Sequence, residues 1–141
     1  MAEIEIVQVH VVQRGADLND EYLVIQNQST DRYHIVGWSV AEHTFGGELV
    51  ACFEFPAQVD GQEWSFDPGE EIYLMTGHGA HAFVNDGYHP PQFQFFMRRE
   101  HPVWCQCAGA VLLRRDGKRI HWLPSPRPLV APAEVERMAA Y

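Results

Sequence analysis

The sequence of 141 residues has little positive charge in its first two thirds and no long apolar run. Residues 1–90 carry fifteen Asp and Glu side chains against Arg14 and Arg32, a local balance of about −13. No segment approaches the roughly 18 uninterrupted apolar residues that indicate a membrane-spanning helix. The formal net charge of −9 also opposes general attraction to phosphate backbones and anionic lipid surfaces. The sequence therefore predicts no membrane partner and argues against nucleic acid as the main partner.

Residue types that carry nucleophilic catalysis are scarce as well. The four serines are Ser29, Ser39, Ser65 and Ser125. None of them stands in a G-x-S-x-G motif, and no glycine-rich phosphate loop precedes a helix. Glu70 and Glu71 are sequence neighbours, so an extended backbone points them to opposite faces, unlike two cooperating carboxylates. We expect a protein that is not an enzyme and that takes no cofactor and no small-molecule substrate.

Cysteine is limited to three residues, an odd number, at Cys52, Cys105 and Cys107. The sequence opens with MAEIEIVQVH, which has acidic residues where a secretory signal has a basic segment and an apolar run. A signal removed beforehand would leave the same pattern. The expectation is a cytoplasmic protein with free, buried thiols.

Short apolar segments with a period of two make up most of the remaining sequence, and Gly, Pro, Asn or Asp separates them. The predicted strands are Ile4–Val12, Glu21–Asn27, Tyr33–Val40, Leu49–Phe55, Glu71–Thr76, Gln92–Met97, Ala110–Arg115 and Lys118–Leu123. A change of phase in the first strand predicts a β-bulge near Ile6 and Val7. Strands of this length at spacings of about 8 to 12 residues indicate an all-β protein, a two-sheet sandwich rather than a small barrel.

The last two predicted strands are joined by Asp116-Gly117. This pair suits a type I′ hairpin turn, in which both central residues have positive φ. Counting outward from the turn, the predicted apolar face consists of Val111, Leu113, Ile120 and Trp122. The opposite face is predicted to carry Leu112, Arg114, Arg119 and His121.

The sequence changes character after the last predicted strand, because Pro124, Pro126 and Pro128 interrupt the strand pattern. Residues 1–128 are therefore predicted as the sandwich and residues 129–141 as a tail. A short helix is predicted from Pro132 onward. Its apolar residues Val135, Met138 and Tyr141 recur at a spacing of three, which suits docking either on its own sandwich or on a partner.

Three segments carry recognisable motifs in a fixed order. They read NDEYLVIQNQSTDRYHIVGWSV at 19–40, FEFP followed by PGEEIYLMTGHG within 53–79, and VWCQCAGAVLLRRDGKRI at 103–120. Together they resemble the lamin tail domain, an immunoglobulin-like β-sandwich, over most of residues 4–123. The residues that match in order are Glu21, Tyr22, Ile25, Asn27, Gly37, Trp38, Phe55, Pro56, Pro68, Gly69, Glu70, Trp104, Gly109, Val111, Leu113, Asp116 and Gly117.

The resemblance implies a structural, protein-binding module, because lamin tail domains are associated with proteins as well as with chromatin. The sequence departs from the family where Cys105, Gln106, Cys107 and Ala110 replace its usual Asn and Asp. It also lacks the coiled-coil heptads of nuclear lamins, so it is similar to the free-standing forms encoded in bacteria. The residues Trp38, Trp104 and Trp122 are expected to anchor the core.

Positive charge is concentrated late in the sequence, where residues 91–141 have a balance of about +4. The predicted binding residues are Arg98, Arg99, Arg114, Arg115 and Arg119. We expect these arginines to form one basic face that contacts an acidic protein surface, either of a partner or of a second copy. A head-to-tail contact of this kind produces rings or filaments.

Two alternatives remain open at this point. One is a metal-binding accessory protein, with His78-x-x-His81 and nearby His89 as loop ligands. A second weak candidate set for metal is Cys105-x-Cys107, completed by His101 or His121. The other alternative is a nucleic-acid-associated domain that uses the basic residues between 98 and 119.

Overall fold

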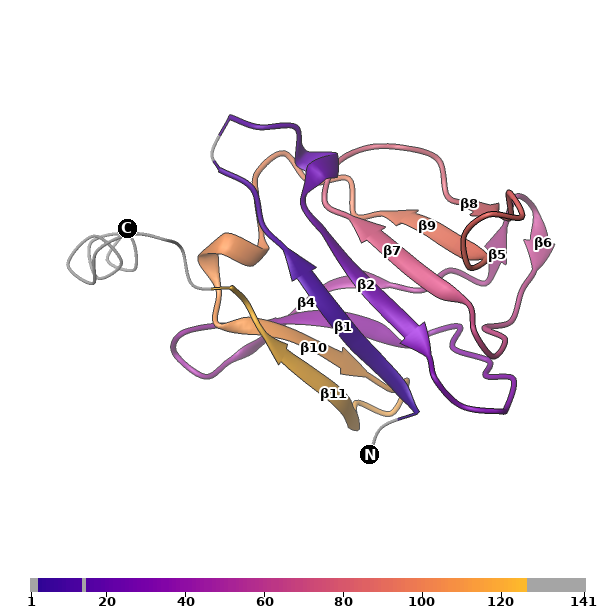
Figure 1. The fold of residues 1–141 in the computed structure, drawn as a ribbon. Helices are drawn as coiled ribbons and strands as arrows, with labels where there is room; N and C mark the ends of the chain where they lie inside the picture. Colours follow the sequence, from indigo (N-terminus) through magenta and orange to yellow (C-terminus); the bar gives the residue numbers. More distant parts are fainter. Residues whose placement is uncertain (1–2, 14, 127–141) are drawn as a thin grey trace.

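The alternating segments form two β-sheets that pack face to face (Figure 1). The computed structural model describes residues 3–13 and 15–126. The larger sheet has the strand order β1-β2-β7-β9-β8, the smaller has the order β11-β10-β3-β4, and β5 pairs with β6 separately. The all-β sandwich prediction is confirmed. The strands are β1 (Ile4–His10), β2 (Tyr22–Asn27), β3 (Ser39–His43), β4 (Leu49–Glu54), β5 (Gln58–Val59), β6 (Gln62–Glu63), β7 (Glu71–Met75), β8 (Ala82–Val84), β9 (Gln92–Phe96), β10 (Gly109–Leu113) and β11 (Arg119–Pro124).

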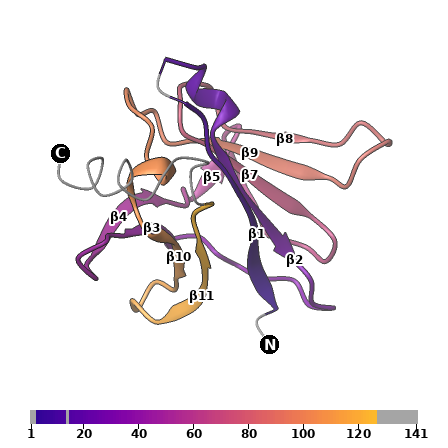
Figure 2. The ribbon, with the colours of Figure 1, turned by 60° about the vertical axis from the view of Figure 1, so that its left-hand side comes forward.

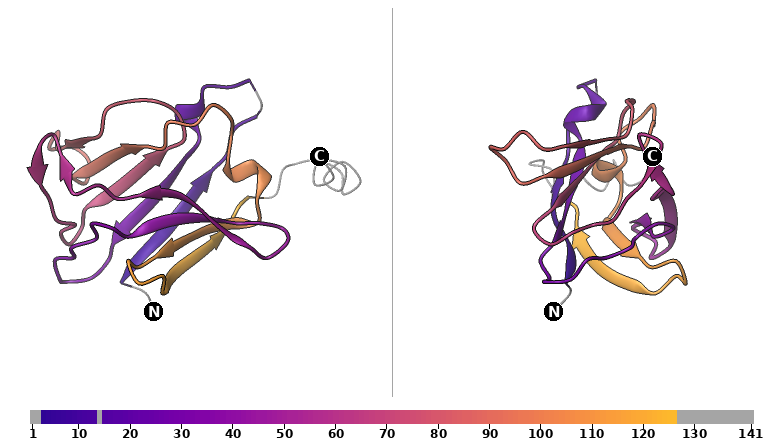
Figure 3. Two further views of the ribbon diagram at one scale, coloured as in Figure 1. Left: turned by 180° about the vertical axis from the view of Figure 1, so that it is seen from behind. Right: turned by 90° about the vertical axis from the view of Figure 1, so that its right-hand side faces the viewer.

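An apolar core fills the space between the two sheets. The right-hand view of Figure 3 shows the two sheets side by side. The largest fully buried side chains include Trp104, Phe55, Phe66 and Phe95. Each aromatic ring of this kind removes roughly 150–250 Å² from water. At about 25 cal/mol per Å², each contributes several kcal/mol before the loss of chain entropy is counted. Trp104 lies in a 3₁₀ helix, η2 (Trp104–Gln106), between β9 and β10.

The bulge in β1 is where the sequence predicts it, because the pairing with β2 shifts between Ile6 and Gln8. Only the last two residues of the predicted strand Tyr33–Val40 lie in a strand. Gly37 has a φ of +83°, and the Trp38 N–H donates to the Ile35 carbonyl oxygen at 3.0 Å, which closes a turn. The strand therefore begins only at Ser39.

The turn between β10 and β11 also differs from the prediction. The Gly117 N–H donates to the Arg114 carbonyl oxygen at 2.9 Å, and Gly117 has a φ of +85°. Asp116 does not have the positive φ that a type I′ turn requires. The loop instead has three residues, and the pairing shifts by one between Leu112 and Leu113.

The predicted apolar face of this hairpin is only partly correct, because Ile120 packs against the core but Trp122 does not. The core side of β10 is formed by Ala110 and Leu112, which belong to the buried cluster. Trp122 lies on the outer face and is 44% exposed. A Cβ atom on Gly109 would stand 2.2 Å from the Trp122 ring, so the missing side chain of Gly109 leaves room for the indole outside the core.

One side of the sandwich is closed by β1 and β11, which run next to each other in Figures 1 and 2. The two strands make no ladder, but the Ile6 N–H donates to His121 Nδ1 at 3.1 Å. No helix in the described part of the chain has the length and apolar character that a membrane span requires. The predicted helix within 129–141 lies outside the described residues.

Candidate functional site

An open cleft of about 690 Å³ lies where the start of β1 meets the β10–β11 hairpin. The residues that line it are Glu3, Ile4, Tyr33, His34, Trp38, Arg114, Lys118, Arg119 and Ile120. We call this site the basic cleft, because three of its side chains are permanent cations and one, Glu3, is an acid.

The hairpin turn between β10 and β11 places the side chains of Arg114, Lys118 and Arg119 at the basic cleft. The Arg114 N–H donates to the Lys118 carbonyl oxygen at 2.8 Å, so the two residues face each other across the loop. Arg114 approaches the Asp116 carboxylate at 3.7 Å. In residues 3–13 and 15–126, neither Lys118 nor Arg119 has a carboxylate within ion-pair distance. Both side chains are exposed and therefore available to an anionic group.

Two aromatic rings lie beside these cations. The rings of Tyr33 and Trp38 meet edge to face with their centroids 6.3 Å apart. Both side chains are half-buried and pack against the core. The Tyr33 hydroxyl donates to the Glu3 carboxylate, so the single acid of the basic cleft is already bonded. The basic cleft thus offers an aromatic surface next to free positive charge.

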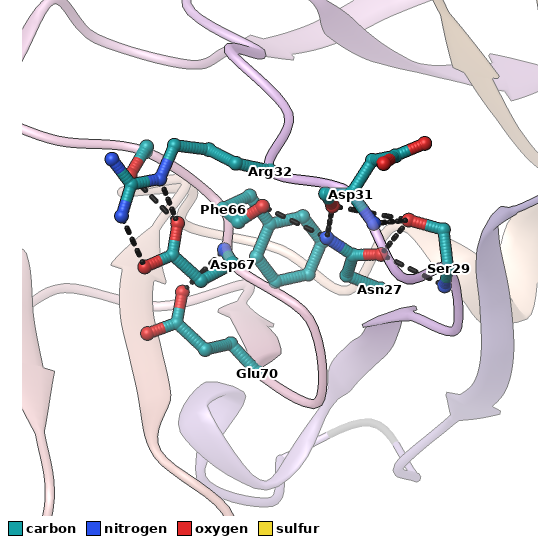
Figure 4. A network of polar contacts seen from close by, with 8 residues as sticks. Asn27, Ser29, Asp31, Arg32, Phe66, Asp67 and Glu70 are labelled. Carbon is teal, nitrogen blue, oxygen red and sulfur yellow. Dashed lines mark hydrogen bonds and ion pairs between the residues drawn. The ribbon is translucent and has the colours of Figure 1, made fainter.

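A polar network beneath the loop before Tyr33 holds this part of the basic cleft in place (Figure 4). Asn27 is buried, and its amide donates to the carbonyl oxygens of Asp31 and Phe66 at 3.0 and 2.8 Å. Its carbonyl oxygen accepts from the backbone N–H and the hydroxyl of Ser29. The Tyr33 N–H then donates to the Phe66 carbonyl oxygen at 2.9 Å, which continues the network into the basic cleft.

The neighbouring turn at 67–70 is tied to the same loop. Arg32 donates to both carboxylate oxygens of Asp67, at 2.8 and 3.3 Å. The Glu70 N–H donates to the Asp67 carbonyl oxygen, and Gly69 has a φ of +80°, a conformation that glycine adopts readily in a turn after proline. Figure 4 shows the contacts of Asp67 with Arg32 and Glu70.

The five arginines predicted as one basic face are divided between the two ends of the sandwich. In the larger sheet β1 pairs with β2, β2 with β7 and β7 with β9, and this register places Ile4 at one end and His10 at the other. Arg98 and Arg99 bond to the backbone of Gly77 and Thr76, at the end of His10. The basic cleft, with Arg114 and Arg119, is at the end of Ile4. Arg115 packs over Gly37 and does not line the basic cleft.

The candidate metal ligands are spread over separate contacts. His78 Nε2 lies 2.6 Å from Glu100, and His89 Nδ1 lies 3.0 Å from Asp86. His81 Nδ1 accepts the Phe96 N–H at 3.2 Å and packs among aromatic rings. Within residues 3–13 and 15–126, no three His, Cys, Asp or Glu side chains are grouped so that they could hold a metal ion.

The thiols are poorly suited to bind metal or to react. The 3₁₀ helix η2 interrupts the extended backbone that would place Cys105 and Cys107 on one face. Burial raises the pKa of Cys107 to about 11 and that of Cys52 to about 12. Burial also raises the pKa of Cys105. These raised pKa values keep the thiols neutral at physiological pH. A neutral thiol is a poor metal ligand, because the thiolate is the form that binds metal.

The tryptophans predicted as core anchors have three different environments. Trp104 is fully buried, Trp38 is half-buried at the basic cleft, and Trp122 is exposed. The sequence reasoning did not assign Tyr33 or Lys118 to a site. The concentration of cations around the hairpin turn was a usable signal for Lys118, but the approach of Tyr33 depends on the tertiary fold.

Comparisons with known proteins add no relationship to this description. The chain matches no protein-family model and no curated protein sequence.

Proposed function

We propose that the protein is a non-catalytic interaction module and that the basic cleft binds an acidic segment of a protein. The observation that carries this proposal is the pair Lys118 and Arg119, which are exposed, lack a carboxylate within the described residues, and lie beside aromatic rings. Carboxylates paired with such cations would steer association and set its specificity. Aromatic side chains next to them supply apolar contact area.

The charge distribution of the chain supports a protein partner rather than a nucleic acid. The three cations of the basic cleft belong to a molecule of net charge −9. A long phosphate backbone would extend beyond the basic cleft and meet the acidic remainder, whereas a short acidic segment can be confined to the cleft. The motifs that resemble the lamin tail domain favour the same class of function, and on that resemblance we propose an immunoglobulin-like, lamin-tail-like module. The cytoplasm is the expected compartment.

The test is direct binding of an acidic peptide. A fluorescein-labelled decapeptide that alternates Glu and Gly is titrated with the protein in 50 mM NaCl, and fluorescence anisotropy is recorded. A matched peptide with Gln in place of Glu is the control. We expect binding of the Glu peptide that is at least about tenfold tighter than binding of the Gln peptide. Equal binding of the two peptides, or no binding of either, contradicts the proposal.

A further inference from the structure

The loop between β8 and β9 projects away from the body of the sandwich (Figures 2 and 3). We call residues 85–91 of this loop the finger; they read NDGYHPP. At its tip, Tyr88 is 91% exposed, which makes it the most exposed large hydrophobic residue in the described part of the chain. Asp86 stands two residues before it. The finger thus presents one ring and one carboxylate together.

We propose that the finger of one molecule inserts into the basic cleft of a second copy, with Asp86 facing Lys118 and Arg119 and with Tyr88 against Tyr33 and Trp38. This inference rests on the proposed function, because it names the protein that supplies the acidic segment. It matches the carboxylate and the exposed ring of the finger to the cations and the rings of the basic cleft. The opposite charges attract, and the rings bury apolar area.

The finger is ordered by its own hydrogen bonds. Asp86 Oδ1 accepts the N–H groups of Tyr88 and His89 at 2.9 and 3.0 Å. These two bonds, and the ring of His89 near Asp86 Oδ2, hold the pKa of Asp86 at about 2. Its carboxylate is therefore charged at neutral pH. A loop that is already held in one conformation loses less entropy on binding.

The positions of the two surfaces make the contact intermolecular. The finger leaves the sheet from β8, whereas the basic cleft borders β1, and these are the two edge strands of the five-stranded sheet. Four strand spacings of about 4.8 Å separate the edges by roughly 19 Å. The finger therefore cannot fill the basic cleft of its own molecule. A contact between two different surfaces repeats from copy to copy, in a ring or a filament.

The experiment uses two variants that each lose one surface. The finger variant carries Asp86→Asn and Tyr88→Ala, and the cleft variant carries Lys118→Glu and Arg119→Glu. A matched control carries Glu48→Gln and Phe45→Ala in the β3–β4 loop, where Phe45 is likewise 63% exposed. Circular dichroism verifies that each variant is folded. Sedimentation velocity then gives the mass at increasing protein concentration in 50 mM NaCl.

We expect the wild-type chain and the control to exceed the monomer mass of 16.1 kDa as concentration rises. Each of the two variants alone stays monomeric. Their equimolar mixture forms a one-to-one heterodimer, because one contributes an intact basic cleft and the other an intact finger. A monomeric wild-type chain, a finger variant that still associates, or a folded mixture without heterodimer overturns the inference. If the Glu peptide binds while the wild-type chain stays monomeric, the proposed function stands and this inference fails.

Discussion

The arginines at the two ends of the sandwich differ in what their guanidinium groups contact. At the end of His10, Arg99 donates to the Cys52 carbonyl oxygen at 2.9 Å, and Arg98 Nη2 lies 3.5 Å from the Gly79 carbonyl oxygen. These side chains connect a loop to the body of the protein. The guanidinium groups of Arg98 and Arg99 thus stabilise the fold through bonds to backbone carbonyl oxygens.

At the other end, the cations of the basic cleft face open space. Arg114 approaches Asp116, while in the described residues Lys118 and Arg119 have no carboxylate partner. Residues of one chemical type, within about twenty positions of each other in sequence, thus bond to backbone carbonyls at one end and carry the binding role that we propose at the other. The difference shows that charged residues close together in the sequence do not necessarily form one charged surface in the folded protein.

Charge reversal should have the largest effect on peptide binding and should act at only one end of the sandwich. Lys118→Glu with Arg119→Glu should weaken binding of the Glu peptide by about 30-fold, because two reversed charges at about 1 kcal/mol each amount to about 2 kcal/mol. Arg98→Glu with Arg99→Glu changes the net charge equally and should alter binding by less than about threefold. Fluorescence anisotropy measures both.

The equal change in net charge makes the second variant a control for general repulsion. If both double variants lose binding to the same degree, the peptide responds to the charge of the whole molecule. The two ends of the sandwich would then not differ in their contribution to peptide binding.

Salt gives the second largest effect. Raising NaCl from 50 to 500 mM should weaken Glu-peptide binding by about tenfold, since screening acts on exposed charges. The hydrogen bond of Arg99 to the Cys52 carbonyl oxygen is short-range, so the loss of stability in Arg99→Ala should depend less on salt than peptide binding does. Parallel anisotropy and urea-unfolding series test this pair. A binding constant independent of salt would show that the basic cleft does not act through its charge.

Much of the fold is predictable because alternation in the sequence reports which segments are strands. The predicted and observed bounds agree closely for the strands at Leu49, Glu71 and Gln92. Alternation does not report which face is inward where both faces are apolar. The sequence GAVLL of β10 is apolar throughout, so it offered no basis for choosing Leu112 over Leu113 as a core residue.

The rest depends on contacts between distant segments. The parallel pairing of β7 with β9 and the approach of Ile6 to His121, 115 positions away, have no local signal. The cations of the basic cleft could be predicted because they flank a recognisable turn. Their aromatic neighbours Tyr33 and Trp38 could not, since the positive φ of Gly37 turns that segment out of the expected strand.

Substitutions at the two ends should also differ, by a smaller amount, in how much they lower the free energy of unfolding. Arg99→Ala removes a charged hydrogen bond to the Cys52 carbonyl oxygen and should lower the free energy of unfolding by about 1 kcal/mol. Arg119→Ala removes an exposed side chain and should change it by less than about 0.5 kcal/mol. Urea unfolding followed by tryptophan fluorescence measures both values. Equal losses, or a larger loss for Arg119→Ala, would reverse the roles assigned to the two ends.

The smallest effect concerns pH. Burial lowers the pKa of His81 below its usual value of 6.5, and the nearby charge of Arg98 lowers it further. Below pH 6.5 the unfolded chain therefore binds a proton at His81 more readily than the folded chain does. The contribution of His81 to the unfolding free energy is full above pH 6.5 and declines as the pH falls through 6.5 toward the folded-state pKa.

Arg98→Ala should raise the His81 pKa and make the decline in unfolding free energy between pH 6.5 and 5 less steep. Arg114→Ala, at the other end, should leave that slope unchanged, and urea unfolding at several pH values distinguishes the two. A slope altered by Arg114→Ala but not by Arg98→Ala would mean that the charge acting on His81 comes from the basic cleft.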